Sequence, residues 1–303
     1  MSETLPMRGA EGALRRHLRE NLVLVLVSVA AFLTQPALAQ TQPSYSPVNF
    51  TDTLKLSRGS LTPISPGGVY LEGDDRCRYV KAEYGWSDCL GIEALIFEPA
   101  EDIDTLMART PTDDGYVSFD DWDREDRDEE IAAIWEGLEE GLEQQGEALG
   151  VVIRPIKWAA YPTLNKQKAY MYYAHVIEWD GVRQISVEAT LFDRRGYQSF
   201  GFVPVAETVS EADIRAMVER TIAAYRSEPG AAYVDFRDGD KVAAVGAIGV
   251  LATVMGVKYG KGALAGILAA AFLFLKKAWF VLLAPIYLFR RIFKRRKGGD
   301  GSA

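Results

Sequence analysis

The side chains of this sequence best suited to catalysis are His175, Ser186 and Glu188. A serine, a histidine and a carboxylate can supply the nucleophile, the base and the orienting group of a hydrolase. The strand register predicted below places His175 opposite Ser186, with Glu188 diagonal to it at roughly 7 Å. Neighbours on a flat sheet lack the sharp nucleophile turn and the oxyanion donors that acyl transfer needs. We therefore prefer a half-exposed polar sheet face without catalysis, and keep a hydrolase as the alternative.

A second candidate site is the loop TPTDDGYVSFDD at residues 110–121. If Gly115 is the sixth position of a calcium-binding loop, then Asp114, Ser118 and Asp121 occupy ligand positions five, nine and twelve. Positions one and three are threonines, so the loop lacks two carboxylates that would make such a site tight. A turn at Asp-Asp-Gly is the preferred interpretation, and a Ca²⁺ site is a weaker alternative. No motif in the chain indicates a cofactor.

A β-hairpin must position the first set of residues. Two apolar runs, Ala169–Trp179 and Val182–Phe192, flank Asp180-Gly181, which is a strong signal for a two-residue turn. Such a turn pairs residues whose numbers sum to 361, so the even-numbered residues of the first strand share one apolar face. A third strand, Tyr197–Val205, extends the same sheet.

Two helices flank these strands. In the first, apolar residues recur at three- and four-residue spacing from Ile131 to Leu142, and glutamates cover the other faces. In the second, Ser210 caps a helix whose apolar stripe runs from Ile214 to Tyr225. The predicted fold class is α+β, an antiparallel meander sheet with flanking helices, followed by C-terminal transmembrane or interfacial helices.

The chain has two cysteines, Cys77 and Cys89. An isolated pair in an exported protein favours a disulfide, which would stabilise the fold by about 3 kcal/mol on the loop-entropy model. The spacing differs from that of a CxxC redox motif. Free thiols and a redox pair are the alternatives.

The N-terminal region predicts export. Residues 1–39 have a positive start, a short apolar run and a small-residue cleavage pattern that ends at Ala39, before Gln40, as in a signal peptide. An uncleaved signal anchor is the alternative, and either one exports the chain after Gln40. Residues 40–70 are rich in Ser, Thr, Pro and Gly and predict a linker or edge segment. Residues 71–236 are expected to form the periplasmic domain.

The C-terminal region, 237–297, predicts a membrane anchor with a basic tail. Each of its apolar blocks is short for a hydrocarbon core of about 30 Å. The blocks are Val242–Val257, Gly262–Leu275 and Ala278–Phe289. We expect one crossing through the second block, while the first block lies against the domain or enters the membrane partway.

Charge supports this orientation. Residues 40–240 contain 19 Lys+Arg and 38 Asp+Glu, a balance that excludes nucleic acid as a partner. The basic tail is expected in the cytoplasm, and residues 298–303 are expected to be disordered. Gly262 and Gly266 would allow close packing of two anchors in a homodimer.

Three runs also carry a family resemblance: DDGYV (Asp113–Val117), RRGYQSF (Arg194–Phe200) and PGAAYVDFRDGDKVAAVG (Pro229–Gly246). With the signal and the anchor, they resemble a family of uncharacterised bacterial membrane-anchored proteins over most of residues 70–297. The resemblance is most specific at Asp235, Phe236, Asp240 and Lys241. It implies the topology and a mixed α/β exported domain, and it supplies no activity and no catalytic residues.

The combined prediction is a protein of the bacterial inner membrane with its main domain in the periplasm. A non-enzymatic binding role is favoured over the hydrolase. The expected partners are membrane lipids and an envelope protein.

Overall fold

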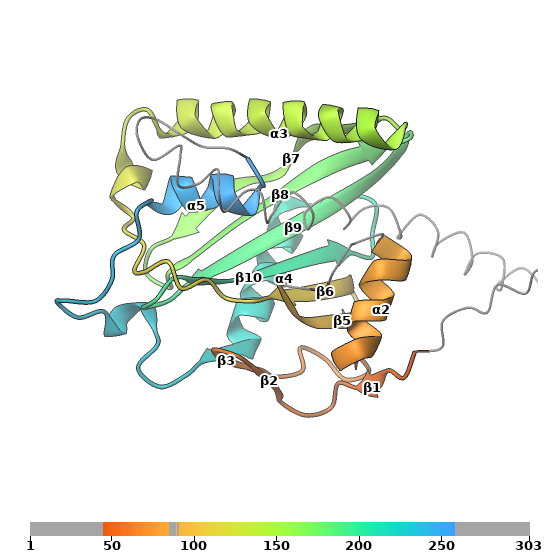
Figure 1. Ribbon diagram of the computed structural model, residues 1–303, viewed down its shortest axis with the longest axis horizontal. Helices are drawn as coiled ribbons and strands as arrows, with labels where there is room; N and C mark the ends of the chain where they lie inside the picture. Colours follow the sequence, from red (N-terminus) through yellow and green to blue (C-terminus); the bar gives the residue numbers. More distant parts are fainter. Residues whose placement is uncertain (1–44, 85–88, 90, 258–303) are drawn as a thin grey trace, which may run out of the picture. The chain divides into compact units, whose positions relative to one another are not determined.

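The computed structural model describes residues 45–84, 89 and 91–257. Their strands form one eight-stranded antiparallel sheet, in the order β1-β4-β5-β6-β10-β9-β8-β7, and one three-stranded sheet, in the order β11-β3-β2 (Figure 1). The large sheet contains β1 (Val48–Asn49), β4 (Val69–Leu71), β5 (Ile92–Ala100), β6 (Ile103–Arg109), β7 (Ile153–Asn165), β8 (Tyr170–Trp179), β9 (Val182–Phe192) and β10 (Tyr197–Pro204). The small sheet contains β2 (Leu54–Leu56), β3 (Gly59–Leu61) and β11 (Tyr225–Ser227). The helices are α2 (Gly73–Tyr84), α3 (Arg127–Leu149), α4 (Glu211–Ala224) and α5 (Ala247–Val254), with short 3-10 turns η1 (Asp120–Asp123) and η2 (Tyr233–Asp235).

The predicted meander is confirmed, because β7, β8, β9 and β10 lie side by side in chain order. The hairpin register is also as predicted, with His175 opposite Ser186 and Tyr173 opposite Glu188. At the turn, Asp180 and Gly181 both adopt positive φ, 47° and 81°. Those angles are typical of the two-residue turn that matches the twist of paired strands.

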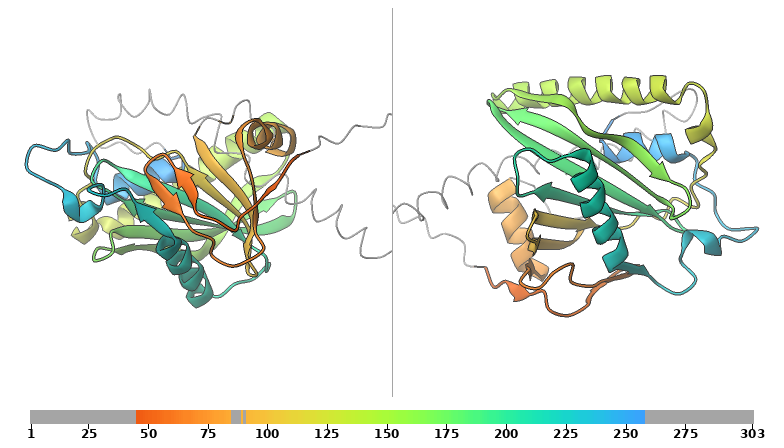
Figure 2. Two further views of the ribbon diagram at one scale, coloured as in Figure 1. Left: turned by 90° about the horizontal axis from the view of Figure 1, so that it is seen from below. Right: turned by 180° about the vertical axis from the view of Figure 1, so that it is seen from behind.

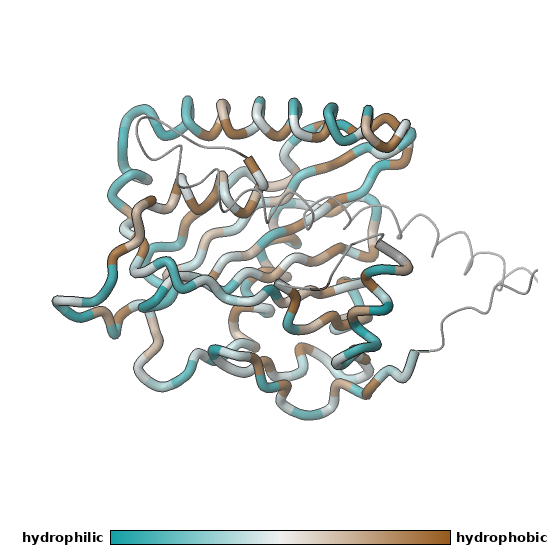
Figure 3. The backbone as a smooth tube through the Cα atoms, in the orientation of Figure 1, coloured by the Kyte–Doolittle hydropathy of each residue, from teal (hydrophilic) through white to brown (hydrophobic). Residues whose placement is uncertain are grey.

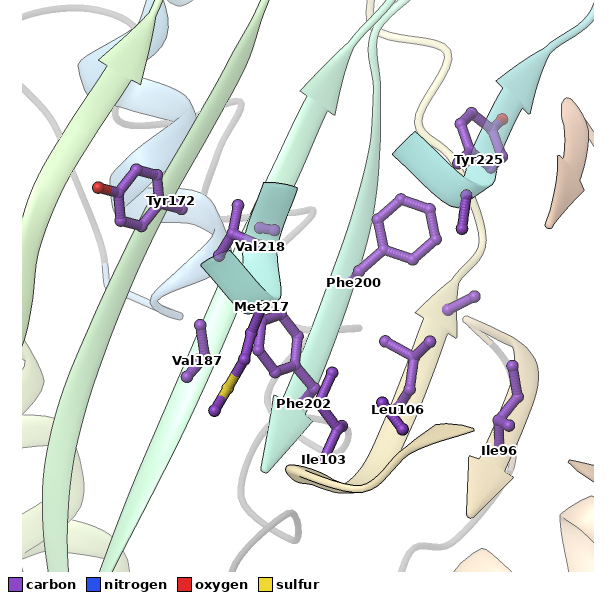
Figure 4. Packing of buried hydrophobic residues seen from close by; sticks show 14 of the residues in the cluster. Ile96, Ile103, Leu106, Tyr172, Val187, Phe200, Phe202, Met217, Val218 and Tyr225 are labelled. Atoms are coloured by element: carbon purple, nitrogen blue, oxygen red, sulfur yellow. The ribbon is translucent and has the colours of Figure 1, made fainter. Parts of the chain in front are cut away.

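The strands β8 and β10 are buried on both faces, and His175 and Glu188 are 3% and 5% exposed, so the prediction that these two residues lie on a half-exposed polar face is wrong. Even-numbered residues of β8, such as Tyr172, lie in one apolar cluster with Phe200 and Met217 (Figure 4). α4 covers that face (Figure 2). Odd-numbered residues, such as Tyr173, lie in a second cluster that includes α3 and α5. The residues of α5 belong to the first apolar block of the expected anchor, for which packing against the domain was one of two predicted arrangements.

The two long helices follow their sequence patterns. α3 alternates between hydrophobic and hydrophilic residues along its length (Figure 3), and it ends at Gly150, whose φ of 69° is left-handed. Glycine tolerates that conformation without steric cost. α4 begins where predicted, since Ser210 Oγ accepts a hydrogen bond of 3.2 Å from Asp213 N.

Residues 45–70, for which a linker or an edge segment was expected, form strands of both sheets. β1 and β2 do lie at sheet edges. Phe50 and Leu61, however, are completely buried in the cluster under α4. β3 pairs with β11, so this early segment joins residues far along the chain.

The predicted disulfide is present between Cys77, in α2, and Cys89, with their Cα atoms 5.0 Å apart. Cys77 lies in the second turn of α2, which spans Gly73–Tyr84. The helix packs through Tyr79 and Val80 on Leu95 and Met107 of the sheet. The bond therefore ties α2 to the chain that enters β5.

The first part of the expected anchor belongs to the folded domain. Ile248 and Leu251 of α5 are completely buried among residues of α3 and the sheet. The first apolar block thus lies against the domain, one of the two arrangements predicted for it. Among the described residues, no helix has the length and apolar character needed to cross a membrane. The predicted signal peptide, the later apolar blocks, the Gly262/Gly266 pair and the basic tail lie outside the described residues.

Candidate binding site

Three loops that are distant in the sequence meet at one end of the sheet. They are the segment after β6 (110–119), the β9–β10 turn (193–196) and the segment before α5 (236–246). Backbone hydrogen bonds join them: Gly115 N donates to Arg195 O at 2.8 Å, and Tyr116 N donates to Lys241 O at 2.8 Å. Each loop carries one of the runs that gave the family resemblance. The sequence did not show that these runs are neighbours.

The loops enclose an open cleft of about 320 Å³. Apart from one glycine, its lining is entirely charged. The lining residues are Asp113, Gly115, Arg194, Arg195, Asp240 and Lys241. We refer to this feature as the loop cleft.

One wall of the loop cleft is a two-bond ion pair. Arg194 Nε and Nη2 donate to the two carboxylate oxygens of Asp240, each at 2.7 Å. The hydrogen bonds from Arg194, together with one from Arg237 N, lower the pKa of Asp240 to about 2. Asp240 is therefore charged at neutral pH, and it fixes the segment before α5 to the β9–β10 turn.

The opposite wall is more exposed. Arg195 Nε lies 3.0 Å from Asp113 Oδ1, and their side chains are 58% and 72% exposed. Lys241 Nζ donates to Asp113 O at 2.7 Å. Exposed ion pairs of this kind contribute only about 0–1 kcal/mol. The charges on this wall can therefore exchange partners with little loss of stability.

A buried ion pair lies next to the loop cleft, since Asp193 directly precedes the lining residue Arg194. Arg58 Nη1 donates to Asp193 Oδ1 and Oδ2 at 3.0 and 2.8 Å, and both side chains are at most 5% exposed. Asp193 Oδ1 also accepts a hydrogen bond of 2.7 Å from Arg195 N. Sequence reasoning missed Arg58, because its partner lies 135 residues away and no local pattern marks the pair.

Gly115 permits the close approach of two of the loops. Its φ is 113°, and a Cβ at this position would lie 2.7 Å from Lys241 O. Any other residue would combine a disfavoured backbone conformation with a backbone clash. The glycine of the Asp-Asp-Gly run thus serves loop packing.

The four residues singled out before the anchor all have contacts in this region. Asp235 Oδ2 accepts a hydrogen bond of 3.1 Å from Ala232 N and closes η2. The ring of Phe236 lies 4.1 Å from that of Tyr116. Asp240 and Lys241 line the loop cleft. The segment therefore docks on the domain, and α5 separates it from the later apolar blocks.

The residues proposed as calcium ligands either accept backbone hydrogen bonds or face solvent. Asp121 Oδ1 and Oδ2 each accept a hydrogen bond of 2.9 Å from a backbone N–H of α5, those of Ala247 and Ile248. Ser118 Oγ accepts one from the backbone, and Asp114 is exposed. Within the described ranges, no group of three or more His, Cys, Asp or Glu side chains could hold a metal ion. Asp121 acts as the N-terminal cap of α5.

The hydrolase candidates share a face of the sheet but form no catalytic arrangement. His175 is 3% exposed, and burial lowers its pKa to about 4. Among the described residues its Nδ1 has no hydrogen-bond partner, and the ring stacks at 5.6 Å on Tyr173. Glu188 is 3.4 Å from Arg109 Nε instead. Burial raises the pKa of Glu188 although this arginine opposes the shift. Ser186 is half-buried, and among the described residues no side-chain hydrogen bond joins it to His175 or Glu188.

These features define the class of protein: an α+β domain built on one large antiparallel sheet, with a charged loop cleft at one end of it. The chain belongs to the family described as "Protein of unknown function (DUF2167)", whose model matches residues 51–287. This confirms the resemblance to an uncharacterised family. The match also spans most of the strands in residues 45–70.

Among solved structures, the chain is similar to the solution structure of cyanobacterial PsbP (CyanoP) from Synechocystis sp. PCC 6803. The identity is 9%, the TM-score is 0.32, and the match covers 62% of this chain and 99% of that one. A likeness at this level carries no argument about function. No curated protein matches the chain.

Proposed function

We propose that this chain is an exported, membrane-held protein that binds a partner through the loop cleft and carries out no catalysis. The observation that supports the proposal is the convergence of three distant loops on one open, charged cleft above a rigid sheet. Loops held by a scaffold in this way are frequent binding sites. Export and attachment to the bacterial inner membrane rest on the sequence of residues 1–39 and 258–297, with the basic tail in the cytoplasm.

The chemistry of the loop cleft favours a partner with charges of both signs. Asp113 and Arg195 are exposed, and their ion pair contributes little stability. A carboxylate of a partner can therefore take the place of Asp113 beside Arg195, and a cation of the partner can take the place of Arg195 beside Asp113. Arg194 and Asp240 are less exposed and keep the wall in place. A polypeptide segment of an envelope protein with alternating acidic and basic side chains fits this pattern.

The test places a photo-crosslinking residue at Val242, which is 56% exposed beside Lys241 and contributes no charge. The full-length protein in its membrane should form a defined adduct. Exchanging the charges in an Asp113→Arg/Arg195→Asp variant should reduce that adduct at least tenfold, because the exposed charge pattern is reversed. Arg58 Nη2 lies 3.6 Å from Asp113 Oδ1, so the exchange also brings two like charges together, and the urea midpoint of the variant is compared with that of the unaltered protein.

The matched control exchanges another exposed pair, Arg220 and Asp102, whose side chains are 46% and 41% exposed. The Asp102→Arg/Arg220→Asp variant should form the adduct at the level of the unaltered cleft. An adduct that survives both exchanges equally would contradict recognition through the loop cleft.

A further inference from the structure

The opposite end of the sheet carries a small exposed apolar surface. Leu149, Val152 and Val182 are 56%, 62% and 38% exposed. We refer to these three residues as the hairpin-tip patch. Single exposed apolar residues are ordinary, whereas a group at the end of a domain often marks a contact surface.

The three residues lie together because two turns hold them. Val152 N donates to Asp180 Oδ1, and Asp180 N donates to Val152 O, both at 2.9 Å. Val182 pairs with Trp179 across the hairpin turn. Leu149 ends α3, three residues before Val152. The patch is therefore built from the end of α3 and the tip of the β8–β9 hairpin.

The surroundings of the hairpin-tip patch match the chemistry of a membrane interface. Trp179 is half-buried beside it. Arg154 and Arg183 flank Glu178, and their side chains are 60% and 64% exposed. Tryptophan at the level of the headgroups, with arginines near phosphate and apolar side chains below, is the usual arrangement where proteins meet lipid.

The hairpin-tip patch and the loop cleft lie at opposite ends of one strand. β9 begins at Val182, in the patch, and ends at Phe192, just before the turn that lines the cleft. Its 11 residues span about 35 Å at the usual rise of a strand. If one end of the sheet meets a surface, the other end therefore faces away from it.

The end of the described chain packs against α3, the helix whose last residue lies in the patch. A Cβ on Gly137 would lie 2.5 Å from Val257 Cγ1, so Val257 is seated against the middle of α3. Leu149 is twelve residues further along that helix, about 18 Å at the rise of an α-helix. The sequence continues from Val257 into apolar blocks within a few residues. A lipid surface reached by those blocks is therefore within reach of the patch.

We infer that the hairpin-tip patch rests on the lipid surface and that the loop cleft points away from it toward soluble or extended partners. The inference depends on the membrane attachment proposed above. What it adds is the orientation of the domain: the hairpin-tip patch contacts lipid headgroups and the first part of the acyl chains.

The experiment uses the full-length protein in vesicles of phosphatidylethanolamine and phosphatidylglycerol. A Val182→Cys variant is labelled with an environment-sensitive fluorophore, since the two native cysteines are joined to each other. The control is Val234→Cys, at a position that is 84% exposed in η2, near the loop-cleft end. Quenchers attached to lipid headgroups should quench the label at 182 at least threefold more than the label at 234.

A Leu149→Cys label should behave like the one at 182, which separates a true contact from a local effect of one substitution. Equal quenching at 182 and 234, or stronger quenching at 234, would overturn the inference. Flotation of the unlabelled protein with the same vesicles is scored independently. Failure to float would overturn the proposed membrane attachment, whereas flotation without quenching at 182 and 149 would overturn the orientation alone.

Discussion

The buried ion pair of Arg58 and Asp193, next to the loop cleft, gives a quantitative prediction. Replacing Arg58 with Met removes both hydrogen bonds from the guanidinium to Asp193 and leaves that carboxylate buried. The donor that remains in the structure is Arg195 N, at 2.7 Å. Removing one partner of a buried ion pair costs about 3–5 kcal/mol, because an uncompensated charge stays in the interior. That is a large share of the roughly 5–15 kcal/mol by which domains are usually stable.

Urea unfolding of the full-length protein in detergent, followed by circular dichroism, measures this loss. The Arg58→Met variant should unfold at a much lower urea concentration with an unchanged slope. An Arg58→Met/Asp193→Leu variant should recover more than half of the lost free energy, because neither charge remains unpaired. Arg220→Met is the matched control, since its exposed pair with Asp102 contributes at most about 1 kcal/mol.

The reasoning is refuted if Arg58→Met costs no more than Arg220→Met. Such a result would mean that Asp193 is solvated or paired elsewhere in the native protein. It would also remove the argument that residues 45–61 are a permanent part of the fold rather than a linker.

Three further predictions concern other parts of the domain. Asp121→Ala should destabilise the protein by about 1–2 kcal/mol and speed hydrogen exchange in the first turn of α5, whereas Asp121→Asn should cost less. Changing both Cys77 and Cys89 to serine should cost about 3 kcal/mol in thermal unfolding, equal to the effect of reducing the native protein. Because burial lowers the pKa of His175 to about 4, its contribution to stability is complete above the unfolded value of about 6.5 and falls as pH decreases toward 4. A His175→Gln variant should lose less stability than the native protein between pH 7.5 and pH 5 in urea unfolding.

The parts of the fold that depend on local chemistry were predictable. The two-residue turn at Asp180-Gly181 fixes the register of its hairpin, because a turn of that length allows one pairing of the flanking strands. Ser210 and Gly150 likewise mark the ends of helices through their own backbone preferences. In each case the residues that decide the structure are adjacent in the sequence.

The environment of His175 was not predictable from its strand. The alternation of β8 is compatible with one polar face, and the cover on that face comes from α3 and α5. The residues of α5 are apolar on all sides, a pattern shared by helices buried in a protein and helices in a membrane. Periodicity alone could not distinguish these two surroundings.

The candidate site was predictable only in pieces. Asp240, Lys241 and the Asp-Asp-Gly run stood out through the family resemblance, but their meeting at the loop cleft depends on pairing over more than one hundred residues. Arg58 had no signal at all, since an arginine in a Ser- and Pro-rich stretch is usually solvated. Contacts between residues so far apart in the chain form only once the whole sheet has folded, so no local sequence pattern marks them.

The position of α5 also determines when the domain can be completed during synthesis. Residues as early as Val117 and as late as Val257 share one apolar cluster. A growing chain that has reached the end of α4 already contains the whole large sheet, but one face of it still lacks its final cover. Until the last described residues arrive, that face is available to chaperones and proteases. The domain can therefore complete its fold only shortly before the final apolar blocks are synthesised. Folding of the domain and synthesis of its C-terminal region are nearly simultaneous.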